Sequence, residues 1–190
     1  MKDWIGNKTI KTLGATNLSD REREINDFYA TDPRAMPALL QEETFNNVWE
    51  CACGQGHLAK ELDKKGILGK ATDLIDRSYG NGQVDFLMEN EKWSGDIITN
   101  PPFRYASQFI ETAISLSDNK VAMLLRIQFL EGRARKKLFR KYPPRFIYVF
   151  SDRLKCALNG NFNDMKGSAV CYAWFVWYKD YIGETIIKWL

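Results

Sequence analysis

The chain has few of the side chains that carry metal or nucleophilic chemistry, with one histidine and four cysteines among 190 residues. Cys51 and Cys53 lie near His57, but no second pair of ligands follows at the spacing of a zinc site. We therefore expect no bound metal, and we interpret the cysteines as reduced, buried thiols. The sequence also offers no good set of residues for an activated nucleophile or a histidine base.

Long hydrophobic runs are also missing, since no apolar stretch approaches the roughly 20 residues that a membrane span requires. The first residues lack the apolar core of a secretory signal. We therefore expect a cytoplasmic protein without a membrane partner. The length suits one domain with a single packed core. We place this domain at residues 28–190, after a polar N-terminal arm at residues 1–27.

The excess of positive charge is small, +3 for the whole chain, and does not by itself indicate a nucleic-acid partner. Its distribution is uneven, because residues 120–155 hold eleven Lys or Arg and only two acidic residues. Such a basic segment attracts phosphate groups, although the solvated face of a surface helix has a similar composition. Arg133, Arg135 and Lys136, in its densest part, are candidate contacts to nucleic acid.

Strand and helix patterns alternate from residue 28 onward, without a repeat or a linker. Short apolar or β-branched runs are typical of buried strands, and apolar residues three or four apart are typical of helices. The alternation predicts an α/β fold: a doubly wound, mostly parallel seven-stranded sheet with an antiparallel last strand. No helix pattern separates the last two strands, so we expect them to form an antiparallel hairpin at the sheet edge. The expected strands are 46–52, 67–74, 83–87, 96–100, 120–127, 145–151 and 168–179, and the expected helices are 31–43, 54–66, 105–118 and 131–142.

A glycine-rich turn, ECACGQGHLA (residues 50–59), joins the first of these strands to the next helix. Doubly wound sheets bind ligands at such turns, and Gly54 and Gly56 allow a ligand to approach bare backbone. Asp73 ends the next strand, about twenty residues on, where an acid accepts hydrogen bonds from ribose hydroxyls. The pattern fits NAD, FAD or S-adenosylmethionine (SAM). Glu50 favours SAM, because its carboxylate repels a pyrophosphate but attracts the ammonium of a methionine moiety.

The stretch DIITNPPF (residues 96–103) ends a β-favouring run with two prolines between an amide and an aromatic side chain. One proline is enough to stop a strand, because it removes an amide donor and fixes φ. A rigid pair of acceptors accounts for the flanking residues as well. The side-chain carbonyl of Asn100 and the backbone carbonyl of Pro101 can hold the two N–H groups of a planar amine, and Pro102 limits their movement. Phe103 can stack on a flat base.

The tetrad NPPF matches the catalytic motif (Asp/Asn/Ser)-Pro-Pro-(Tyr/Phe) of the SAM-dependent N6-adenine DNA methyltransferases, which the chain resembles over residues 28–179. ECACGQG is similar to the family's cofactor loop, Asp-Pro-x-Cys-Gly-x-Gly, with Glu50 for Asp and Cys51 for Pro. DFYATDP resembles its upstream Phe-x-Thr-Pro element, displaced by one residue. ATDLID and VDFL resemble its ribose-binding and adenine-binding elements. The motif order resembles that of gamma-type members, and the compact form resembles bacteriophage enzymes.

This resemblance implies a Rossmann-like class I methyltransferase fold, SAM as cofactor and DNA as partner, in a bacterial or phage-infected cell. It also implies roles for individual residues. The implied catalytic residues are Asn100, Pro101, Pro102 and Phe103. The implied cofactor-binding residues are Phe28, Tyr29, Thr31, Glu50, Ala52, Cys53, Gly54, Gly56, Asp73, Leu74, Asp85 and Phe86.

Family members that read a defined DNA site usually carry a separate recognition domain, for which we find no segment here. Selectivity would then come from the arm, the basic helix or residues 152–167, where Phe162 is either a second stacking surface or a core aromatic. Related Asn-Pro-Pro-aromatic loops occur in methyltransferases of RNA bases and of protein glutamine, so these substrates are alternatives. An inactive binding module is disfavoured because tetrad and glycine turn are both intact. A dehydrogenase leaves NPPF unexplained.

Overall fold

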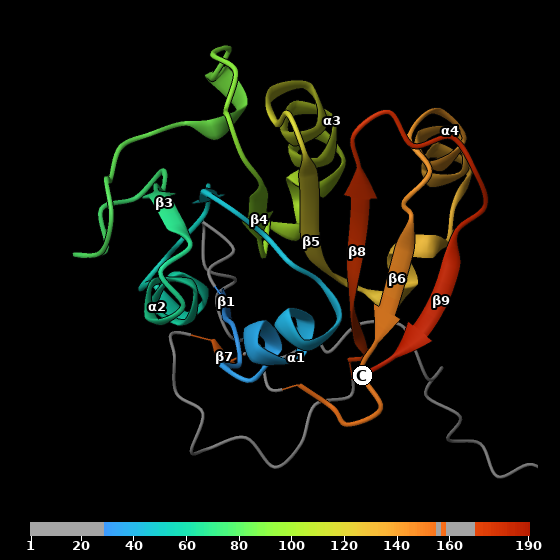
Figure 1. The fold of residues 1–190 in the computed structure, drawn as a ribbon, viewed down its shortest axis with the longest axis horizontal. Helices are drawn as coiled ribbons and strands as arrows, with labels where there is room; N and C mark the ends of the chain where they lie inside the picture. Colours follow the sequence, from blue (N-terminus) through green and yellow to red (C-terminus); the bar gives the residue numbers. More distant parts are fainter. Residues whose placement is uncertain (1–28, 155–156, 159–169) are drawn as a thin grey trace, which may run out of the picture.

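A seven-stranded sheet forms the centre of the computed structural model, which describes residues 29–154, 157–158 and 170–190 (Figure 1). Its strands are β2 (Val48–Glu50), β3 (Leu68–Ala71), β4 (Ile97–Thr99), β5 (Lys120–Arg126), β6 (Phe146–Val149), β8 (Tyr172–Tyr178) and β9 (Ile186–Trp189). Their order is β3-β2-β4-β5-β8-β6-β9. Only β8 runs antiparallel to its neighbours. The predicted doubly wound, mostly parallel seven-stranded sheet is therefore confirmed.

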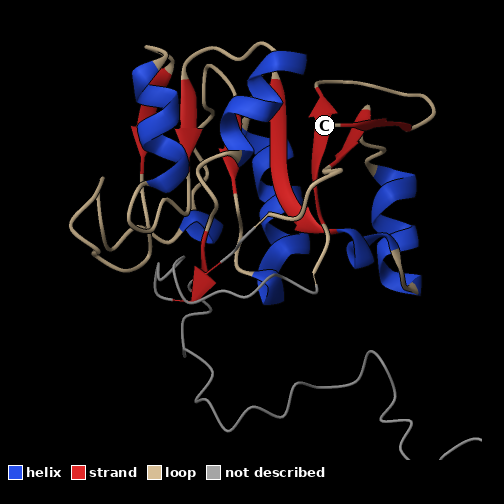
Figure 2. Cartoon of the chain, turned by 90° about the horizontal axis from the view of Figure 1, so that it is seen from below, coloured by secondary structure: helices blue, strands red, loops and turns tan. Residues whose placement is uncertain are grey.

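Helices cover both faces of this sheet (Figures 1 and 2). They are α1 (Ala35–Glu42), α2 (His57–Lys64), α3 (Ala106–Leu116) and α4 (Arg133–Lys141). Side chains alternate between the faces along each strand: in β5, Met123 packs with the cluster of α3 and α4, and Leu124 packs with that of α1 and α2. Within the described residues, no helix has both the length and the apolar character needed to cross a bilayer.

Short elements complete the described chain at the ends of the strands. The 3₁₀ helices are η1 (Phe86–Met88), η2 (Phe103–Tyr105) and η3 (Ile127–Leu130). A separate two-stranded sheet pairs β1 (Tyr29–Ala30) antiparallel with β7 (Ala157–Leu158). This pairing holds the start of the described chain in place just before Thr31.

The prediction of a strand at residues 83–87 is wrong. The Asp85 carboxylate accepts a hydrogen bond from the Leu87 amide (3.0 Å) and thereby starts the 3₁₀ helix η1. Such local side-chain bonds compete with strand pairing. Phe86 is buried against Trp49 and Phe109, with ring centroids 5.2 and 5.1 Å away. Its apolar character therefore serves packing without any strand.

The last two predicted strands, β6 and β8, do pair antiparallel as expected, but the prediction that they lie at the sheet edge is wrong. β8 is antiparallel, as expected, but it lies between β5 and β6 and pairs with β5 over seven residues. The edge belongs to β9, which the sequence did not reveal and which pairs parallel with β6. Ile186, Ile187 and Trp189 are 40–70% exposed, so β9 lacks the alternating pattern of a half-buried strand.

The start of β4 is fixed by the buried carboxylate of Asp96. It accepts hydrogen bonds from the backbone amides of Asn46 (2.6 Å) and Lys120 (2.8 Å) and from the Asn119 side chain (2.7 Å). Burial raises the pKa of Asp96, and these hydrogen bonds partly oppose the rise. Asp96 thus joins the amino ends of β4 and β5, and the NPPF segment leaves the far end of an anchored strand.

Candidate active site

A cavity of about 930 Å³ lies at the carboxyl ends of four adjacent strands, β3, β2, β4 and β5. Each strand end places one polar side chain in its wall: Asp73, Glu50, Asn100 and Arg126, in that order. Open α/β sheets bind their ligands at this edge. The lining residues are Ala30, Thr31, Glu50, Cys51, Ala52, Cys53, Gly54, His57, Leu58, Asp73, Leu74, Arg77, Val84, Asp85, Phe86, Leu87, Asn100, Pro101, Pro102, Phe103, Arg104, Tyr105, Phe109 and Arg126.

The glycine turn is tied to the end of β3 through Asp73. One carboxylate oxygen accepts from the Gly54 amide (2.8 Å), and the other accepts from the Ile75 amide (2.9 Å). Since each oxygen carries two acceptor sites, the carboxylate keeps capacity for ligand hydroxyls. Gly56 does not line the cavity: it has φ +78°, and a Cβ there would lie 2.5 Å from the Tyr79 ring. Its role is to allow the turn that starts α2.

Glu50 is a buried carboxylate whose Oε2 has no hydrogen-bond partner among the described residues. Burial raises its pKa well above the usual range, and the nearby charge of Asp73 raises it further, while the Ala59 amide opposes the rise. A carboxylate held in this way gains most from a cationic ligand group, because such a group offsets the desolvation and supplies the missing donor. The cavity wall therefore fits a ligand that carries an ammonium.

The cysteines of the site are not poised as nucleophiles. Burial raises the pKa of Cys53 to about 12, and it also raises the pKa of Cys51 well above its usual value. Both thiols are therefore protonated at neutral pH, whereas catalysis by cysteine requires the thiolate. The three cysteines in the described residues are free, and Cys156 lies outside them. The described residues also contain no cluster of His, Cys, Asp and Glu that could hold a metal ion.

Asn100 lines the cavity at the end of β4. Its amide nitrogen donates to Thr31 Oγ1 (2.9 Å), while its buried Oδ1 has no donor among the described residues. The Pro102 carbonyl accepts from the Tyr105 amide (2.9 Å) and closes η2. In the described part of the chain, the carbonyl of Pro101 accepts no hydrogen bond. Two unpaired acceptors thus follow β4, held by Thr31 and by proline backbone.

Phe103 completes this corner of the cavity. The Arg126 guanidinium lies over its ring, 4.1 Å from the ring centroid, and its ring centroid is 6.2 Å from that of Tyr172. Arg126 and Tyr172 face each other across the β5–β8 pairing. The aromatic face proposed for base stacking therefore carries a cation in this structure.

Most of the site residues predicted from the sequence line this one cavity. Thirteen of them line the cavity: Thr31, Glu50, Ala52, Cys53, Gly54, Asp73, Leu74, Asp85, Phe86, Asn100, Pro101, Pro102 and Phe103. Tyr29 forms β1 beside the cavity residue Ala30. Phe28 and Phe162 lie outside the described residues.

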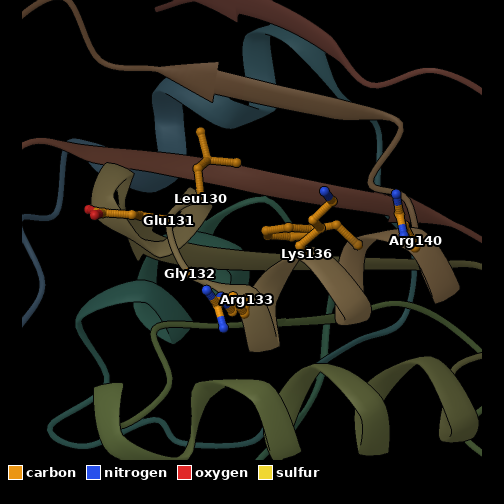
Figure 3. Close-up of a pocket in the computed structure, with 7 residues that line it drawn as sticks. Leu130, Glu131, Gly132, Arg133, Lys136 and Arg140 are labelled. Atoms are coloured by element: carbon orange, nitrogen blue, oxygen red, sulfur yellow. The ribbon is translucent and has the colours of Figure 1, made fainter.

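The basic residues of α4 border a second, shallow cleft outside the main cavity (Figure 3). Arg133 and Lys136 line it together with Arg140, from the last turn of α4, and with the exposed Leu130, from η3. Arg135 lies elsewhere, with its guanidinium 4.7 Å from the ring centroid of Phe129. The structure thus brings two of the three predicted basic contacts together and adds Arg140.

Several residues that line the cavity were not among the site residues predicted from the sequence. They include His57, Arg77, Arg104, Tyr105 and Arg126. Arg126 had a recognisable signal, because it is the first charged side chain after the buried run VAMLL, where β5 reaches the carboxyl edge. His57 lies within the glycine-rich turn, Arg104 and Tyr105 directly follow NPPF, and Arg77 is four positions after Asp73, so all four are close in sequence to the recognised motifs.

Comparison with solved structures identifies the fold as that of class I methyltransferases. A putative class I SAM-dependent methyltransferase from Listeria monocytogenes matches with a TM-score of 0.61 and 13% identity, over 90% of this chain and 68% of the other. Magnesium protoporphyrin IX methyltransferase from Synechocystis with bound SAH matches at 0.53 and 14%, over 77% and 80%.

A type I restriction-modification methyltransferase subunit from Streptococcus thermophilus matches at 0.57 and 11% identity. The match covers 85% of this chain and 48% of that subunit. No family model and no curated protein matches the chain. At these identities the comparisons show the fold, and the arguments for cofactor and substrate rest on the side chains of the cavity.

Proposed function

We propose that this protein transfers a methyl group from SAM to the exocyclic N6 amine of adenine in DNA. The observation that carries the proposal is the buried Oδ1 of Asn100, which has no donor among the described residues and belongs to a side chain that lines the cavity with Asp73 and Glu50. An acceptor of this kind suits an N–H donor of the substrate, because an unsatisfied buried carbonyl is costly. Three neighbouring strand ends thus supply one contact each: Asp73 to the nucleoside, Glu50 to the ammonium and Asn100 to the target amine.

In this proposal the residues of the cavity hold SAM as follows. Asp73 accepts hydrogen bonds from the ribose hydroxyls, with its orientation fixed by the Gly54 and Ile75 amides. Glu50 receives the ammonium of the methionine moiety. Asp85 and Phe86 border the adenine. When bound, SAM supplies a methyl group that is electrophilic because it is attached to a sulfonium.

The NPPF segment then acts on the target amine. The N6 lone pair of adenine is delocalised into the ring, so the amine is a weak nucleophile. Asn100 Oδ1 and the Pro101 carbonyl accept its two N–H groups, fix its position and raise the electron density on nitrogen as it attacks the methyl carbon. The carbon–sulfur bond breaks as the carbon–nitrogen bond forms, and the nitrogen then loses a proton to solvent. No thiolate or metal is needed.

The choice of nucleic acid as substrate is supported by the cationic cleft of α4. Arg133, Lys136 and Arg140 offer three positive charges on one helix. Backbone phosphates are the natural partners of such a cluster. In duplex DNA the target adenine would have to leave the stack to reach the cavity, and the restriction-modification methyltransferase subunit named above shares the fold.

The direct test supplies the purified protein with methyl-labelled SAM and, in separate reactions, DNA, tRNA, rRNA and protein. We expect label in DNA, recovered as N6-methyladenine by nucleoside mass spectrometry. Label in RNA or protein alone would move the assignment to those substrates. SAM binding without transfer to any of them would indicate an inactive module.

The Glu50→Gln variant should bind SAM about tenfold more weakly yet make the ligand-free protein more stable. Because the folded-state pKa of Glu50 lies above its unfolded value, folding retains a proton on this group. The stability of the wild type therefore falls as pH rises above the unfolded pKa. Glutamine removes this loss, so the advantage of the variant should grow with pH. Urea denaturation from pH 5 to pH 8 and calorimetric SAM titration measure both effects. A variant that is less stable throughout would show that Glu50 has a structural role.

Replacing Arg133 and Lys136 by alanine should weaken DNA binding and reduce the slope of log K against log salt concentration by about two units. The matched control replaces Lys64 and Lys65, two cations at the end of α2 away from both cavities. This control should keep the wild-type slope. Fluorescence anisotropy over a salt series gives the slopes. Equal slopes in the two variants would show that the α4 charges face solvent and do not contact DNA.

A further inference from the structure

Arg126 occupies an unusual position for a cation in a substrate cavity. It is the last residue of β5, half-buried, and its guanidinium lies 4.1 Å from the centroid of the Phe103 ring. Its Nε is buried without a hydrogen-bond partner among the described residues. The described part of the chain also provides no salt bridge for Arg126, although Glu50 and Asp73 line the same cavity.

The distance to Phe103 matters because it is close to the separation of two stacked planar groups. A base that stacked on this face of Phe103 would need the space in which the guanidinium lies. The two cannot be there together, so a target base that uses this face must displace Arg126. The displacement costs the cation–π contact between Arg126 and Phe103.

The unpaired Nε indicates what can offset this loss. A guanidinium has five N–H donors in a planar fork, and it binds phosphate through two parallel hydrogen bonds. Beside a target nucleotide, the groups with this chemistry are the phosphodiesters on either side of its sugar. Arg126 begins at the base-binding position and is attached to a fixed strand, so its long side chain can reach past the base to the backbone.

We propose that Arg126 covers the stacking face of Phe103 until a target nucleotide enters, and then binds a phosphate that flanks this nucleotide. The inference rests on the proposed function, since it assumes a nucleotide substrate. In this arrangement the protein favours nucleotides within a strand over free bases. A free base that enters breaks the Arg126–Phe103 contact and offers the guanidinium no new partner, whereas a flanking phosphate does.

The test combines the Arg126→Gln variant with an adenine-containing oligonucleotide that the wild type methylates. A second oligonucleotide carries uncharged methylphosphonates at the phosphates flanking the target. With the wild-type protein, the methylphosphonates should raise KM about tenfold. Arg126→Gln should raise KM for the normal oligonucleotide by a smaller factor, because the variant has no cation to displace from Phe103, with kcat and SAM affinity nearly unchanged. With both changes together, no further loss is expected, because they remove the same contact.

Two further readouts separate this role from simple packing. Arg126→Lys keeps the charge but not the planar fork, so it should retain the salt dependence of the wild type, whereas Arg126→Gln should lower the slope by about one unit. Free adenosine has no phosphate and should bind Arg126→Gln at least as well as it binds the wild type.

If the losses from the variant and the methylphosphonates multiply, the inference is wrong while the proposed function stands. A variant with weakened SAM binding and reduced stability would likewise assign Arg126 a structural role. Absence of methyl transfer by the wild type to any DNA would refute the proposed function itself, and this inference with it.

Discussion

Asn100→Ala should still bind the cofactor but should transfer methyl groups much more slowly, with kcat lowered by about 10²- to 10³-fold. The change removes the side-chain carbonyl that lies buried and unpaired in the cavity, together with the hydrogen bond to Thr31. Without this acceptor the amine is neither aligned nor polarised at the moment of attack. Asn100 is not among the residues proposed to hold SAM, so calorimetry should give a SAM dissociation constant within about twofold of the wild type.

Two variants make this prediction specific. Asn100→Asp keeps oxygen acceptors at the same place and should recover much of the lost rate, whereas Asn100→Ala should not. Asn90→Ala removes an exposed asparagine that does not line the cavity and should leave kcat and SAM affinity unchanged. If Asn100→Ala retained most of the wild-type kcat in single-turnover assays, the amine-binding role of the NPPF segment would be wrong.

Asp73→Ala should weaken SAM binding by about 100-fold, because it removes the charged acceptor proposed for the ribose hydroxyls. It should also lower the free energy of unfolding by about 1–3 kcal/mol. The reason is structural: the Gly54 and Ile75 amides, which donate to this carboxylate at 2.8 and 2.9 Å, lose their partner. Calorimetric titration and urea denaturation measure the two effects separately.

Asp76→Ala is the matched control for Asp73→Ala. Asp76 is an exposed aspartate three positions along the same loop, and its carboxylate accepts from the Ser78 amide (2.9 Å). Its loss should disturb the loop locally without changing SAM affinity. Unchanged SAM affinity in Asp73→Ala would exclude the ribose assignment, whereas equal losses in both variants would point to a general effect of the loop.

Local chemistry explains why much of the site could be predicted from the sequence. The run IIT followed by two prolines fixes both the end of β4 and the rigidity of the segment after it. The positive φ angles of Gly54 and Gly56 are requirements of the turn itself. Because parallel strands end at a common edge, residues that follow separate strands were expected in one place, and Glu50, Asp73 and Asn100 do share one cavity.

Contacts between distant segments could not be predicted in the same way. Thr31 and Asn100 are 69 residues apart, and nothing in either segment specifies the hydrogen bond between their side chains. The position of β8 between β5 and β6 is a matter of strand order, which hydrophobic periodicity does not encode. The same holds for Arg126, whose contact with Phe103 depends on the neighbouring ends of β4 and β5.

The most direct measurement of the central claim is a crystal structure of the protein with SAH and adenosine bound. We predict that the N6 amine lies within hydrogen-bonding distance, about 2.7–3.2 Å, of both Asn100 Oδ1 and the Pro101 carbonyl. The SAH ribose should lie at Asp73. An adenine bound away from Asn100, or an Asn100 carbonyl that pairs only with the Thr31 hydroxyl, would contradict the account.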